Sequence, residues 1–248
     1  MASLLEEFEI HHMGPPMFSV MGHPVAFTNS ALFMFLAIGA CTLLMVAAMR
    51  PQAVVPGRWQ MLAEKLYDLV ADMVQSGAGE KAQAFFPFIF SIFVFILFCN
   101  LFGMLPGSLA VTSHLIINLV IALTLFAIII ITGFIRHGAH FLTLFVPKGV
   151  PAVMVLPMMI IEFLSFAVRP FSLAIRLFAN MLAGHILLQV FAGMVASLLA
   201  AGWLAGLSIL PMAANIAITG FEFFVAFLQA YIYAVLASVY LRDAIEMH

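Results

Sequence analysis

The sequence predicts an all-α integral membrane protein with about five membrane-crossing helices. Of its 248 residues, 65% are hydrophobic and only 8% are charged, whereas soluble domains carry roughly 25% charged residues. The mean hydropathy is +1.20, and several apolar runs reach the roughly 20 residues that a helix needs to cross a bilayer. These observations exclude a water-soluble globule and predict one membrane domain over residues 1–248.

Charge and cysteine content exclude further classes of protein. Nine Lys and Arg against eleven Asp and Glu give a net charge of −2, so no basic surface is available for nucleic acid. Cys41 and Cys99 lie inside apolar runs, which gives no basis for a disulfide framework. The fragment 77–81 lacks the spacing of a phosphate-binding loop. We expect no nucleotide, cofactor or metal site.

The first three crossings follow an outer N-terminal segment at 1–28 and are predicted at 30–49, 85–105 and 112–135. Each run is apolar over about 20 residues. Polar residues such as Asn29 and Thr112 supply helix start signals, and Pro51 and Pro106 supply stops.

Residues 58–75 form a different kind of segment. Apolar residues recur there at helical spacing, and Gln, Glu, Lys and Asp fill the opposite face. This pattern predicts an amphipathic helix at the cytoplasmic interface or against a partner. A simple connector that turns the chain is an equally good interpretation.

The last two helices are predicted at 152–200 and 208–242. At a rise of about 1.5 Å per residue, their lengths are roughly 70 Å and 50 Å, more than a bilayer core requires. Both must therefore tilt strongly, bend or break, and Pro170 is the natural point for a kink. A rival interpretation breaks the first helix at Arg169-Pro170 into two crossings, which reverses the side of the C-terminus.

The distribution of Lys and Arg predicts the orientation. The first 49 residues and the connections 105–113 and 201–210 contain none, whereas the remaining connections and the C-terminal end carry seven. Cytoplasmic loops are enriched in these residues. Five crossings with the N-terminus outside and the C-terminus inside place all seven on the cytoplasmic side.

Ionisable residues inside membrane spans are costly and usually mark a pathway. Glu162, Arg169 and Arg176 are seven residues apart, which places them on one helix face. Ser172 and Asn180 lie four residues before and after Arg176 and extend this face. On the last helix, polar residues repeat at the same period through Asn215, Glu222, Gln229 and Asp243, with Leu236 in the one slot that is not polar.

A second polar face on the first long helix contains His185 and Gln189. Histidine and glutamate change protonation near neutral pH in suitable surroundings, whereas arginine stays charged. Groups that can pass protons beside one fixed cation favour proton translocation over solute binding.

Two stretches carry a family resemblance. FLSFAVRPFSLAIRLFANMLAGHILLQ at 163–189 and GFEFFVAFLQAYIYAVLASVY at 220–240 resemble subunit a of the F-type ATP synthase membrane sector, in its mitochondrial and alphaproteobacterial form. The order of spans and the run NLFGMLPG at 100–107 agree with it.

The resemblance implies roles for individual residues. Arg176 matches the arginine that faces the carboxylates of a rotating ring of small hairpin subunits, the c-ring, and Asn180 and Gln229 match its polar neighbours. His185 and Glu222 match a coupled pair of positions, and Glu162 matches an acidic position of the inner half-channel. Further candidates for channel lining are Arg169, Ser172, Gln189, Asn215, Asn100, His114 and Asn118; for the last three, hydrogen bonding between helices is an equal alternative.

The implied function is the proton-channel stator of a rotary synthase, a subunit without catalysis of its own. Its implied partners are the c-ring, b-type subunits of the peripheral stalk, the remaining synthase subunits and lipid. The alternative is a self-contained proton-coupled transporter with a midplane site. That class predicts related halves, yet no internal repeat is visible and five spans divide poorly.

Overall fold

The structure is a computed structural model of the whole chain. It describes residues 18–20, 23–49, 57–78, 80–105, 110–138, 140–141, 152–203 and 205–245. The expectations for residues 1–17 and for most of the connection before Ala152 lie outside this part of the chain.

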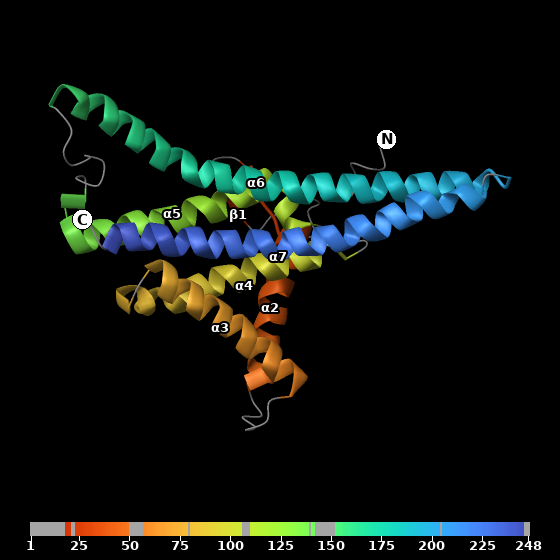
Figure 1. Cartoon of the computed structure of the whole chain (residues 1–248), viewed down its shortest axis with the longest axis horizontal. Helices are drawn as coiled ribbons and strands as arrows, with labels where there is room; N and C mark the ends of the chain where they lie inside the picture. Colours follow the sequence, from red (N-terminus) through yellow and green to blue (C-terminus); the bar gives the residue numbers. More distant parts are fainter. Residues whose placement is uncertain are drawn as a thin grey trace. The chain divides into compact units, whose positions relative to one another are not determined.

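Five helices in the described residues are long and apolar enough to cross a membrane. They are α2 (Asn29–Met49), α4 (Phe86–Gly103), α5 (Leu115–His137), α6 (Ala152–Ala200) and α7 (Ile209–Ile245) (Figure 1). The amphipathic helix is α3 (Arg58–Ala78), and 3-10 turns η1 (Glu80–Phe85) and η4 (Ala205–Ser208) precede α4 and α7. The predicted all-α membrane class is confirmed.

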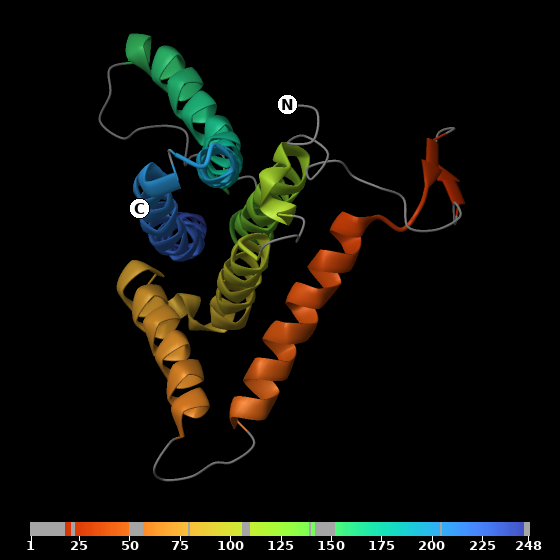
Figure 2. The same cartoon turned by 90° about the vertical axis from the view of Figure 1, so that its right-hand side faces the viewer.

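Two features differ from the sequence-based expectation. The strands β1 (Phe18–Val20) and β2 (His23–Val25) pair antiparallel ahead of α2 (Figure 2). The third span does not begin at Thr112, because residues 111–113 form the separate 3-10 turn η2 (Val111–Ser113). The Ser113 hydroxyl donates to the Ala110 carbonyl at 2.6 Å, and the extended backbone of His114 then separates this turn from α5.

Helix α6 runs without a break through Pro157 and Pro170. Each proline removes one backbone donor, yet membrane helices tolerate this where neighbouring helices protect the backbone. Pro170 is buried. The rival interpretation that divides this segment into two crossings is therefore wrong.

The chain forms two compact units. Unit 1 comprises Met1–Pro51, Val94–His114 and Leu177–Ala230, and unit 2 comprises Gln52–Phe93, Leu115–Arg176 and Tyr231–His248. Helices α4, α6 and α7 therefore contribute residues to both units.

Within unit 2, α3 packs against its own chain. Val70 and Val74 are buried, the Tyr67 ring meets the Phe86 ring edge-on at 4.7 Å, and a Cβ at Gly77 would lie 3.4 Å from the Cβ of Ser238 in α7. This packing supports the connector role predicted for the amphipathic helix. Trp59 and Leu62 near its start remain exposed.

Candidate functional site

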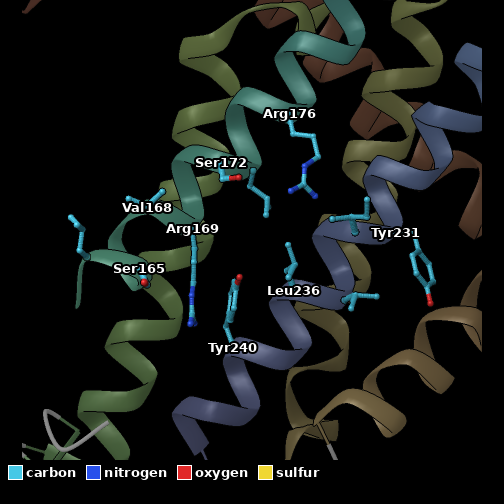
Figure 3. Close-up of a pocket in the computed structure, with 12 residues that line it drawn as sticks. Ser165, Val168, Arg169, Ser172, Arg176, Tyr231, Leu236 and Tyr240 are labelled. Carbon is cyan, nitrogen blue, oxygen red and sulfur yellow. The ribbon is translucent and has the colours of Figure 1, made fainter. Parts of the chain in front are cut away.

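A pocket of about 740 Å³ lies between α6 and α7 within unit 2 (Figure 3). One half of its lining residues are Leu, Val and Ile side chains; the other half are polar, namely Ser165, Arg169, Ser172, Arg176, Tyr231 and Tyr240. Because the α6 members are three or four residues apart, they share one helix face. Of the predicted stripe, Arg169, Ser172 and Arg176 line this pocket, whereas Glu162 and Asn180 do not.

Arg176 is the exposed cation of this pocket. Its guanidinium extends into the space between α6 and α7 (Figure 3), and its side chain is exposed. Among the residues that the structure describes, no hydrogen bond or ion pair holds it. A permanent charge at this position in a membrane span requires water or an external anion.

Arg169 has different surroundings from Arg176. Its Nη2 lies 3.7 Å from Oε1 of Glu162, with both side chains partly exposed. The guanidinium carbon lies 5.6 Å from the ring centre of Phe166 and 4.9 Å from that of Tyr240. Arg169 is therefore held by one carboxylate and two aromatic rings.

Unit 1 holds the second predicted group, around Glu222. The Glu222 side chain is only 3% exposed, and its carboxyl packs against the backbone of Gly184, the residue before His185. Neither carboxyl oxygen accepts a hydrogen bond from the described residues. Burying such a group without a partner is costly.

Gly184 makes the close approach of Glu222 possible. A Cβ built at Gly184 would overlap the Glu222 carboxyl, reaching within 2.8 Å of its carbon. Only glycine fits at this position of α6 without displacing the acid. The half-buried His185 and the buried Glu222 thus come from neighbouring turns of α6 and α7 in one unit.

Asn100 also lies in unit 1, and it hydrogen-bonds to the backbone of α7 near Glu222. Its Nδ2 donates to the carbonyl oxygen of Ala226 at 3.1 Å, one helical turn after Glu222. Its Oδ1 accepts no hydrogen bond from the described residues. His114, also in unit 1, is half-buried, and burial lowers the pKa of its imidazole below the usual range, which favours the neutral ring.

The remaining predicted residues lie in these two units as well. Unit 2 contains Asn118, which is buried in α5. Unit 1 contains the half-buried Asn180, Gln189 and Asn215 and the buried Gln229. In the part of the chain that the structure covers, no group of three or more His, Cys, Asp or Glu could hold a metal ion.

Sequence reasoning missed four residues of these sites. Ser165 lines the pocket from the same face of α6 as Arg169 and Ser172. Tyr231 and Tyr240 line the pocket, but only folding brings α7 beside the arginines of α6. Gly184 contacts Glu222, and its single hint in the sequence is its place directly before His185.

Comparisons with known proteins agree with this architecture. The family model described as ATP synthase A chain matches residues 31–242. ATP synthase subunit a of Methylobacterium sp. (strain 4-46) is 51% identical over 230 residues, covering 92% of each chain. The subunit a of Pelagibacter ubique is 43% identical over 98% of each chain, and that of Maricaulis maris is 47% identical over 98% of this chain and 96% of its own. This multi-pass membrane protein therefore belongs to the ATP synthase A chain family.

Proposed function

We propose that this chain is the proton-conducting stator subunit of a rotary ATP synthase in a bacterial inner membrane. The observation that carries the proposal is the exposed, unneutralised Arg176 in the pocket of unit 2. Family membership favours a subunit of this complex over a self-contained transporter.

The physical role of Arg176 follows from the cost of charge in lipid. A carboxylate on a rotating c-ring can pass through lipid only when it is protonated, because the bare anion is heavily penalised there. A fixed guanidinium stabilises the anion, so the protonated carboxyl can release its proton beside it. The same guanidinium repels protons, which prevents direct leakage between an inlet and an outlet.

The buried groups of unit 1 supply the proposed outer pathway. Glu222, His185 and Asn100 lie within one unit, and the carboxyl oxygens of Glu222 and Oδ1 of Asn100 are buried and accept no hydrogen bond from the described residues. Protons that enter along these groups would be taken up by the ring carboxylate, and the protonated ring carboxyl would later release them towards Glu162, at the edge of the unit 2 site, on the inner side. Asn180, Gln229, Gln189, Asn215, His114 and Asn118 are further proposed channel residues.

Replacement of Arg176 tests the proposal. Arg176→Ala should abolish ATP-driven acidification of inverted membrane vesicles and ATP synthesis. Arg176→Lys should fail as well, because lysine lacks the planar, permanently charged guanidinium. Arg58→Ala is a matched control, since Arg58 is an exposed arginine at the start of α3. Coupled pumping near the wild-type rate in Arg176→Ala, with the complex assembled, would refute the proposal.

A further inference from the structure

The pocket of unit 2 contains two guanidinium groups in unequal surroundings. Arg169 meets Glu162 at 3.7 Å and the rings of Phe166 and Tyr240 at 5.6 Å and 4.9 Å. Its guanidinium extends towards Tyr240 and away from Arg176 (Figure 3). Among the described residues, Arg176 has no ion pair and no aromatic ring within cation–π distance.

The aromatic rings contribute more than Glu162 to this position of Arg169. An ion pair at 3.7 Å between side chains that are 30% and 50% exposed contributes little. A guanidinium within about 6 Å of an aromatic ring centre is attracted to the ring face, and arginine also stacks on rings through its planar group. Tyr240 is the nearer ring and comes from α7, so it fixes Arg169 of α6 from across the pocket.

We propose that Tyr240 is a positioning residue that keeps Arg169 away from Arg176. The inference rests on the proposed function, in which Arg176 binds and releases a ring carboxylate. A carboxylate between two unrestrained guanidinium groups would be attracted by both and released more slowly. With Arg169 held at the wall beside Glu162, Arg176 is the single cation that meets the incoming anion.

The test compares replacements of Tyr240 in two backgrounds of the assembled complex. Tyr240→Leu should lower ATP-driven proton pumping by about fivefold, the factor equivalent to losing one partly exposed cation–π contact. Tyr240→Phe keeps the ring and should pump at the wild-type rate. In an Arg169→Gln background no second guanidinium remains to be held, so adding Tyr240→Leu should cause no further loss.

Arg169→Lys is a second way to release the cation at position 169 from the Tyr240 ring. Lysine keeps the positive charge but has no planar group to stack on Tyr240, so it should reproduce the defect of Tyr240→Leu while the tyrosine remains. Wild-type pumping in Arg169→Lys would overturn the inference.

A charge-specific measurement separates positioning from a structural effect. Ser172 is exposed, lines the pocket and lies between the two arginines in sequence. Ser172→Cys, with Cys41 and Cys99 replaced by alanine, can be labelled with anionic and cationic methanethiosulfonates. The ratio of the anionic to the cationic rate should rise in Tyr240→Leu and return when Arg169→Gln is added. An unchanged ratio would contradict the inference.

Arg176→Ala in the same vesicles reports on the proposed function independently. Normal pumping in that variant would overturn both ideas. If Arg176→Ala fails while Tyr240→Leu loses as much pumping with Arg169→Gln as without it, only the positioning role of Tyr240 is wrong.

Discussion

At the scale of single residues, Gly184 is the position of α6 that lies against the buried Glu222 carboxyl. A Cβ there would overlap the Glu222 carboxyl, which is buried and accepts no hydrogen bond from the described residues. A methyl group would therefore push the acid out of its present position rather than fill empty space.

We expect Gly184→Ala to reduce proton pumping while leaving the complex assembled, because Glu222 must move. The measurement is ATP-driven acidification of inverted vesicles, normalised to the amount of subunit in the membrane. Gly193→Ala is the matched control on the same helix, since nothing lies within 4 Å of a Cβ built there. Equal pumping in the two variants would show that the contact between Gly184 and Glu222 is not functional.

His185 and Glu222 remain a predicted functional pair. Both lie in membrane spans, and neither carries a charge cheaply without a partner or water. The structure places the Glu222 carboxyl against the residue before His185, although the two side chains are not hydrogen-bonded to each other.

The exchange of the two residues tests this pairing. His185→Glu and Glu222→His should each impair proton flux, and the double variant should recover part of it, because one acid and one imidazole then occupy the same space. Acidification by inverted vesicles of all three variants is the measurement. A double variant no better than the worse single variant, at equal assembly, would show that the residues act separately.

At the scale of helices, the length of the apolar runs predicted the spans but not the start of α5, which begins after the 3-10 turn η2. Five spans and the amphipathic helix follow from apolar runs and helical periodicity. The start of α5 cannot be predicted in this way. The Ser113 hydroxyl bond to Ala110 and the extended backbone of His114 depend on local geometry, which mean hydropathy does not describe.

For the candidate site, the sequence predicts the charged residues but not the residues that contact them. Charged residues in lipid stand out in a sequence, so Glu162, Arg169, Arg176 and Glu222 could be found from composition and spacing. The roles of Tyr240 and Gly184 depend on which turn of α7 faces which turn of α6. Both are common residue types in apolar helices, and no spacing rule distinguishes them.

The end of α5 illustrates how close packing limits sequence change. Gly133 is buried, and a Cβ there would overlap the ring of Phe141, which itself is 1% exposed. In an open helix position, Gly→Ala stabilises by about 1 kcal/mol. At Gly133 the same substitution should destabilise the protein, because the added methyl group would overpack a filled site.

We expect Gly133→Ala to destabilise the protein by about 1–3 kcal/mol, the usual cost of forcing extra volume into a packed site. Thermal inactivation of the purified complex is the measurement. Gly39→Ala in α2, where a built Cβ meets nothing within 4 Å, should leave the inactivation temperature unchanged or raise it. Adding Phe141→Leu to Gly133→Ala should restore part of the loss, and failure to do so would locate the strain elsewhere.

At the scale of the whole molecule, the basic residues predict how the chain crosses the membrane. Arg58 and Lys65 lie in α3, Arg136 ends α5 and Arg242 lies in the last turn of α7. An odd number of crossings with α3 in the cytoplasm places all four on the same side, as the enrichment of Lys and Arg in cytoplasmic loops requires.

Single cysteines introduced after removal of Cys41 and Cys99 test this orientation. Gln60→Cys in α3 should react with a membrane-impermeant thiol reagent in inverted vesicles and be protected in right-side-out vesicles. Ala201→Cys, an exposed position between α6 and α7, should show the opposite pattern, because the intervening connections and spans place it on the periplasmic side. Protection of Gln60→Cys from the cytoplasmic reagent would overturn the topology. The same accessibility at both positions would mean an even number of crossings between them, against the three that α4, α5 and α6 supply.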